Sequence, residues 1–136
     1  MSLSMFMEVE QGATLGDIKD VLRSLAVEFG EESEVLSGFF EESNCHFVFK
    51  CDSLPEDLVV EGAQVNWSVG LRGAFHYRAN NLHSSWLDIV HFMRSYSHAQ
   101  PCRFVLSFHY ETIYAIRDEG GLKFVGPMND HGEVVG

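Results

Sequence analysis

The most constraining feature of the sequence is a long alternation of apolar and polar residues, LSFHYETIYAIRDEGGLKFVG at 106–126. A period of two places every second side chain on one face of a β-strand. The glycine pair interrupts this alternation, and a loop at 119–121 would fold the stretch into a hairpin with Ile116 opposite Phe124. We predict two or three strands whose even positions face the core, namely Phe104, Leu106, Phe108, Tyr110, Tyr114, Ile116, Leu122 and Phe124.

Two other segments have the spacing of amphipathic helices. Residues 13–30 begin with a capping box of Thr14 and Asp17, repeat apolar residues every three or four positions, and reach Gly30, which we expect to end the helix. In the second segment, SSWLDIVHFMRSYSHA at 84–99, Ser85 and Asp88 are the expected cap. Its predicted buried face consists of Trp86, Ile89, Val90, Met93 and Tyr96.

The remaining patterns are typical of strands and turns. The runs 35–40 and 45–51 flank the polar stretch EESN and predict a hairpin, followed by a turn in DSLPEDL at 52–58. In AQVNWSVGLRGAFHYRA at 63–79, Gly73 either bends one long strand or separates two. Hairpins dominate, so we predict a single α+β domain over 5–136, with a mostly antiparallel sheet and two helices packed on one side. Residues 1–4 are expected to be a cloning remnant or a disordered start.

The charge of the 136-residue chain is strongly acidic and unevenly placed. The net charge is −11, and before Gly62 fourteen carboxylates face three basic side chains, whereas six acidic and six basic residues follow. Such a field repels nucleic acid and anionic membranes and attracts basic partners. The sequence has neither a secretory signal nor an apolar run of the ~20 residues that span a membrane. We therefore expect a cytoplasmic protein that contacts neither nucleic acid nor membrane directly.

The sequence contains no pattern typical of a catalytic, cofactor or metal site. Cys45 and Cys51 lie about 20 Å apart along one extended run, too far for a disulfide or a shared metal, if each strand residue rises ~3.3 Å. His83, His91 and His98 are spaced too widely along the second helix to hold one zinc ion, and no HExxH or paired CxxC motif occurs. A GxSxG nucleophile motif is also absent. The sequence predicts no catalytic residue, cofactor or metal site.

One acidic segment, EFGEESEVLSGFFEE at 28–42, stands out because its carboxylates surround a small apolar group. Such a run is either a solvated face or a rim of charge around apolar anchors, the arrangement expected where a basic protein docks. On the second interpretation the candidate partner-binding residues are Glu31, Glu32, Glu34, Phe39, Phe40, Glu41 and Glu42.

The small size, the net charge of −11 and SSWLDIVHFMRSY followed by a long β-hairpin resemble the cognate immunity proteins of bacterial toxin systems. The resemblance implies a cytosolic α+β domain that blocks a toxin, often a basic nuclease, by covering its active site without chemistry or a cofactor. Two alternatives remain open. The chain is instead a small binding or oligomerisation module, including a DNA-mimic inhibitor, or an enzyme whose site follows no known pattern.

Overall fold

A computed structural model of the chain describes residues 2–60, 62 and 65–134. Within this part of the chain eight strands form one antiparallel sheet in the order β2-β3-β4-β5-β1-β6-β7-β8. The strands are β1 (Ser2–Glu10), β2 (Phe29–Glu32), β3 (Val35–Phe39), β4 (His46–Glu56), β5 (Val69–Arg78), β6 (Phe104–Phe108), β7 (Thr112–Asp118) and β8 (Gly121–Phe124). The two α-helices are α1 (Leu15–Ser24) and α2 (Leu82–Ala99), and the short 3₁₀ helix η1 (Ala79–Asn81) leads into α2.

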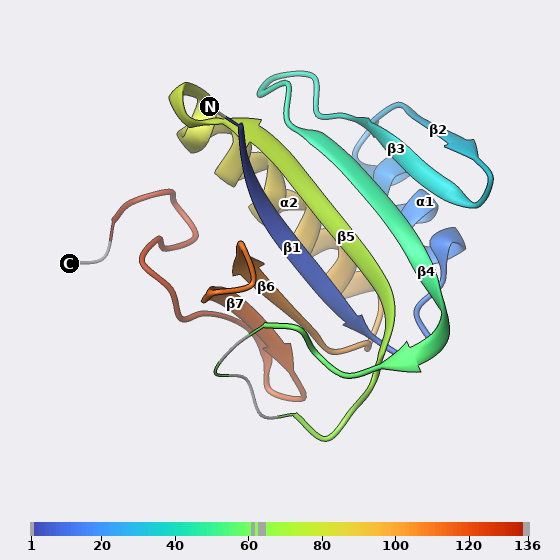
Figure 1. The fold of residues 1–136 in the computed structure, drawn as a ribbon. Helices are drawn as coiled ribbons and strands as arrows, with labels where there is room; N and C mark the ends of the chain where they lie inside the picture. The colour runs from blue at the N-terminus through green and yellow to red at the C-terminus, as the bar shows by residue number, and fades with distance from the viewer. Residues whose placement is uncertain (1, 61, 63–64, 135–136) are drawn as a thin grey trace.

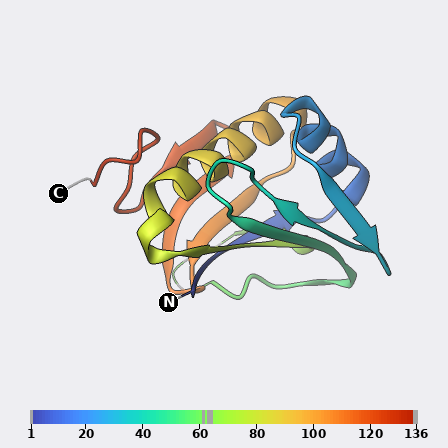
Figure 2. The ribbon, with the colours of Figure 1, turned by 90° about the horizontal axis from the view of Figure 1, so that it is seen from above.

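Both helices lie on the same side of the sheet, as Figures 1 and 2 show. The core is the layer between them and the sheet, where alternate residues of the central strand β1, Met5, Met7 and Val9, are buried. The opposite face, called the open face below, carries the other set of β1 side chains, including Phe6 and Glu8. The predicted α+β class, with a mostly antiparallel sheet and two helices on one side, is confirmed. No helix in the described part of the chain is long and apolar enough to cross a lipid bilayer.

The strand β1 was missed by the sequence analysis, and the expectation of a disordered start is wrong for Ser2–Ser4. These residues open β1, which pairs with β5 from Ser2 opposite Arg78 onward. Met1 lies outside the described residues. The sequence of β1, SLSMFMEVE, does alternate, with Leu3, Met5, Met7 and Val9 on the core face, and only Phe6 interrupts the pattern by placing an apolar side chain on the open face.

The helix α1 begins as predicted and ends earlier than predicted. Thr14 Oγ1 accepts the Asp17 N–H, and the Asp17 carboxylate accepts the Thr14 N–H. At the other end Ala26 adopts φ 56°, with its N–H donated to Arg23 O and the Val27 N–H donated to Leu22 O. These two hydrogen bonds satisfy carbonyl groups of the last helical turn, and the helix ends before Ala26, which has the left-handed conformation. Gly30 is therefore not the terminator and lies in β2.

The helix α2 begins three residues before the predicted cap. Its first residue is Leu82, and neither Ser85 nor Asp88 caps it, because both lie within the helix and η1 leads directly into the first turn. The predicted buried face is confirmed and also includes Phe92. Its predicted members, all buried, are Trp86, Ile89, Val90, Met93 and Tyr96.

The segments around β4 and β5 are more extended than predicted. The hairpin of β3 and β4 is confirmed, but β4 continues to Glu56, so the predicted turn over 52–58 is wrong for its first five residues. β5 is one continuous strand, with Gly73 directly opposite Phe49 of β4. Residues 65–68 precede this strand and belong to the connection from β4.

The register predicted for 104–124 is right in the first strand and again for Tyr114, Leu122 and Phe124, which pack against the core. It is wrong for Tyr110 and Ile116. Phe104, Leu106 and Phe108 pair with core positions of β1. The β6–β7 ladder has a register shift between Leu106 and Ser107, and from Ala115 onward the odd-numbered residues of β7 face the core instead of the even-numbered ones. Ala115 is therefore the core residue opposite Phe124. Ile116 instead pairs with Val105 and Lys123, on the open face. Tyr110 stacks on Phe6, also on the open face. The loop between β7 and β8 has two residues instead of three.

Candidate partner-binding site

The acidic segment is split by the fold between two locations. Glu31 and Glu32 lie on β2, at one edge of the sheet, and Glu34 lies in the turn to β3 with φ 63°. Glu41 and Glu42 lie in the turn between β3 and β4, at the other end of β3. All five side chains are exposed.

The two aromatic candidates differ in accessibility, and the expectation that both are surface anchors is wrong. Phe39 is 54% exposed and its ring lies 4.7 Å from the ring of His46 on the open face. Phe40 is only 4% exposed and packs against the rings of Phe47 and Phe75 in the core. Adjacent side chains of an extended chain point to opposite faces, so Phe40 continues the core side of Leu36 while Phe39 lies on the open face. Of the two side chains, only Phe39 is accessible to a partner.

A groove of about 1050 Å³ lies where the turn after β3 faces α2. Three segments line it: residues 25–30 between α1 and β2, residues 37–44 around the end of β3, and one face of α2. The α2 residues Ser84, Leu87, Asp88 and His91 follow the spacing of a single helical face. The groove therefore joins parts of the chain that are more than forty residues apart.

The groove carries negative charge without internal compensation. Its lining contains Glu28, Glu41, Glu42 and Asp88 but no lysine or arginine. In the described part of the chain none of these four carboxylates forms an ion pair. A patch with this imbalance attracts cationic groups, and the attraction is screened over about 8–10 Å at physiological ionic strength.

The carboxylates on the β2–β3 hairpin are compensated only in part. Glu31 forms an ion pair with Lys19 of α1 at 2.5 Å, and both side chains are partly exposed to solvent. Within the described residues Glu32 and Glu34 have no ionic partner. The hairpin therefore carries unpaired negative charge of its own, and none of Glu31, Glu32 and Glu34 lines the groove.

Among the groove carboxylates, the sequence analysis did not identify Glu28 or Asp88 as binding residues, and Asp88 is the less exposed of the two. Its Oδ2 atom is shielded from solvent and has no hydrogen-bond partner among the described residues. Nearby, burial raises the pKa of the Cys45 thiol to about 12, and the Asp88 charge adds to this shift. A thiol with such a pKa is not an effective nucleophile near neutral pH. The helical spacing of Ser84, Leu87, Asp88 and His91, which places them on one face of α2, was the sequence feature from which Asp88 could have been identified.

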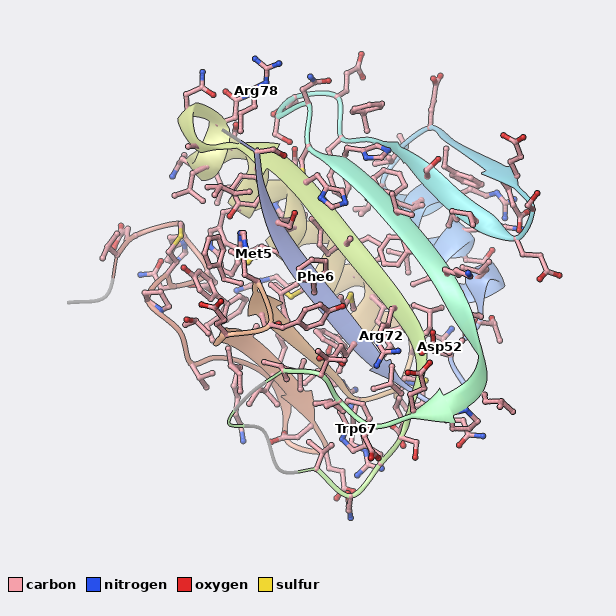
Figure 3. The ribbon with its side chains drawn as sticks, in the orientation of Figure 1. Met5, Phe6, Asp52, Trp67, Arg72 and Arg78 are labelled. Carbon is pink, nitrogen blue, oxygen red and sulfur yellow. The ribbon has the colours of Figure 1, made fainter. Side chains whose placement is uncertain are left out.

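A second polar cluster on the open face serves the fold. The buried Glu8 accepts the backbone N–H groups of Val59 and Val60 at 2.7 and 3.1 Å. Arg72 lies beside it and donates to Asp52 Oδ2 at 2.6 Å, as the facing side chains in Figure 3 show. These contacts hold residues 57–60 against the sheet, and the Glu8 carboxylate is fully engaged within the chain.

The histidines and cysteines do not converge on a metal centre in the part of the chain that the structure describes. No group of three or more histidine, cysteine, aspartate or glutamate side chains is arranged to hold a metal ion there. His83, His91 and His98 are exposed on α2. His46 and His76 stack across β4 and β5 with ring centroids 5.9 Å apart, and Ser4 Oγ contacts His76 Nδ1 at 2.7 Å.

No protein-family model, no curated protein sequence and no solved structure matches the chain. The site is therefore described from its own geometry alone: a concave surface with uncompensated carboxylates, beside an exposed aromatic side chain.

Proposed function

We propose that this protein binds a basic protein partner through the face formed by the β2–β3 hairpin, the turn after β3 and α2. The best candidate activity is that of an immunity protein, which inhibits a basic bacterial toxin in the cytoplasm by covering it. The observation that carries the proposal is the set of unpaired carboxylates around the groove, with Phe39 exposed at its rim. No chemistry by this chain is required.

The two kinds of side chain have different roles in this proposal. Exposed carboxylates raise the rate of encounter with a basic surface, whereas a desolvated aromatic side chain mainly lengthens the life of the complex. Glu31, Glu32 and Glu34 therefore steer the partner, and Phe39 anchors it. Phe40 supports this surface from the core and does not contact the partner.

The partner is to be isolated by affinity capture from the native host and identified by mass spectrometry. Its gene is then expressed with and without the present protein. The proposal predicts that the captured partner is basic, that it arrests growth when expressed alone, and that co-expression restores growth. A partner that is harmless when expressed alone, or that arrests growth equally with the present protein, contradicts the inhibitor function.

The steering role is measured by surface-plasmon kinetics at two salt concentrations with the triple variant E31Q/E32Q/E34Q. We expect association to slow roughly three- to tenfold at low salt and its salt dependence to flatten. The matched control is E111Q/E119Q/E133Q, which removes the same number of exposed carboxylates outside the site. Equal slowing in both variants would mean that net charge alone, and not this surface, guides the encounter.

The anchoring role is measured by the dissociation rate of Phe39→Ala. Because Phe39 is largely exposed, the substitution leaves the fold intact, and we expect dissociation to accelerate roughly tenfold or more. An unchanged dissociation rate would exclude Phe39 from the interface.

A further inference from the structure

We propose that His46 and His76 form a pH-sensitive contact on the open face of the sheet. While both imidazoles are neutral, the contact holds the end of β3 that carries Phe39, and it loosens once both are charged. Neither histidine lines the groove. The inference goes beyond the proposed function and does not depend on it, because the pair can be tested in the protein alone.

The first support is a row of side chains that crosses the sheet on the open face. Phe39 on β3 pairs with His46 on β4, which pairs in turn with His76 on β5. Ser4 on β1 continues the row, because it pairs with His76 and its N–H contacts His109 Nε2 at 3.4 Å. The row joins four neighbouring strands and brings three histidines to one end of the open face.

The second support is the close packing of the rings in this row. The ring centroid of His46 lies 4.7 Å from that of Phe39 and 5.9 Å from that of His76. On its other side His76 is held by Ser4, whose Oγ atom lies 2.7 Å from His76 Nδ1. His46 therefore lies between Phe39 and the anchored ring of His76, so its position determines what Phe39 packs against.

The third support is the small number of other contacts at this end of β3. The last pair of the β2–β3 ladder is Phe29 with Gly38, so Phe39 extends beyond β2 and has its strand partner on β4. In the described part of the chain the His46 ring is the one aromatic ring that packs against Phe39. The contact with His46 is therefore the main restraint on this side chain.

No negative charge in contact with the pair compensates its protonation. Arg78 lies on the same face of β5, two residues beyond the pair and at the end of the strand labelled in Figure 3, and it adds positive charge. The neighbours of the pair on this face of β4 and β5, Val48 and Ala74, are uncharged. The exposed Glu41 and Glu42 lie in the adjacent turn, and neither forms an ion pair with a histidine among the described residues.

Titration of the pair then weakens the contact. Like charges directly opposite each other on two strands destabilise the pairing. The repulsion is relieved when the His46 ring turns towards solvent, because His76 is bonded to Ser4, and Phe39 then loses its stacking partner. His109 acts in the same direction, since a protonated Nε2 no longer accepts the Ser4 N–H.

The direction of the pH dependence follows from the second proton. Burial lowers the pKa of His76 below its ordinary value of 6.5, and the charge of His46 adds to this shift. His76 therefore binds its proton less readily in the folded chain than in the unfolded chain. The fold keeps its full stability above pH 6.5 and loses stability as the pH falls through this value.

The first measurement is an NMR titration of the full chain from about pH 8 to about pH 5, which follows the histidine C–H signals and the Phe39 ring protons. In His46→Gln the midpoint of His76 should rise, because the neighbouring charge is removed. In the control variant His91→Gln, at an exposed position of α2, the midpoint of His76 should be unchanged. The Phe39 ring protons of the wild type should shift over the same pH range as the pair.

The second measurement is urea unfolding at about pH 7.5 and about pH 5.5. Acidification should raise the unfolding equilibrium constant of the wild type roughly three- to tenfold more than that of His46→Gln, as expected for two charges 5.9 Å apart near the protein surface. His76→Gln should reduce the acid sensitivity in the same way, whereas His91→Gln should retain it. Circular dichroism at the higher pH verifies that each variant is folded.

Three results would each overturn the inference. These are an unchanged His76 midpoint in folded His46→Gln, Phe39 ring protons that do not shift as the histidines titrate, and equal acid sensitivity of the wild type and both glutamine variants of the pair. The failures of the two proposals are distinguishable. No partner enters these measurements, so they leave the inhibitor function unaffected, and a captured partner that is harmless leaves the histidine contact unaffected.

Discussion

Gly73 provides a direct test of how tightly the core is packed. It lies in the middle of β5 opposite Phe49, and a Cβ at this position would lie 2.4 Å from Cε1 and 2.6 Å from Cδ1 of the Phe49 ring. The ring has little room to move, because it packs against the rings of Phe75 and Phe92 with centroids 5.7 and 5.2 Å away. The substitution Gly73→Ala must therefore displace a buried aromatic side chain or the strand itself.

The expected magnitude follows from two opposing effects. Overpacking a well-packed core costs about 1–3 kcal/mol. Alanine is favoured over glycine within a strand by about 0.5–1 kcal/mol, which offsets part of this cost. We expect Gly73→Ala to lower the free energy of unfolding by about 1–2 kcal/mol, which shifts the urea midpoint by about 0.5–1 M at a typical slope of ~2 kcal/mol/M.

The assay is urea unfolding followed by circular dichroism, with a double-mutant cycle. In a Phe49→Leu background the clash with the ring is absent, so the added methyl group should be neutral or stabilising there. The matched control is Gly30→Ala on β2, where a Cβ would meet no other atom within 4 Å. Wild-type stability in Gly73→Ala, or an equal loss in the Phe49→Leu background, would refute the packing argument.

Two further predictions concern the buried and partly buried carboxylates. Replacing Glu8 with alanine removes the acceptor for the N–H groups of Val59 and Val60. We therefore expect the free energy of unfolding to fall by roughly 3 kcal/mol and hydrogen exchange at these two amides to become faster. Exchange as slow as in the wild type would contradict the role assigned to Glu8. Hydrogen bonds from Arg103 hold the pKa of Glu10 below its ordinary value of 4.5. A depressed pKa stabilises the fold above pH 4.5, and this contribution is lost as the pH falls through the folded-state value. Unfolding free energies measured from pH 6 to pH 3 should therefore converge between wild type and Glu10→Gln, and a constant difference would exclude this linkage.

The local patterns predicted from the sequence depend on residues close together in the chain. Thr14 and Asp17 form their capping box because both partners lie within one helical turn. The alternation over 45–51 placed Phe47 and Phe49 on one face, where both are buried, because a strand determines its own two faces. The uneven charge and the hairpin of β3 and β4 were likewise evident without a structure.

Other features depended on which surfaces the fold covers. Strand alternation places Phe39 and Phe40 on opposite faces, but only the fold decides that the face of Phe40 is covered by the core and the face of Phe39 is left open. The alternation of β1 was present in the sequence, whereas the burial of Glu8 under residues 57–60 was not, because a period of two does not reveal that a second segment covers the open face. In the candidate site, Glu41 and Glu42 were identified from the acidic run, whereas Asp88 was read as a helix cap. Its place in the groove comes from the packing of α2 beside a turn more than forty residues earlier, and such a contact is set by tertiary structure because no local spacing encodes it.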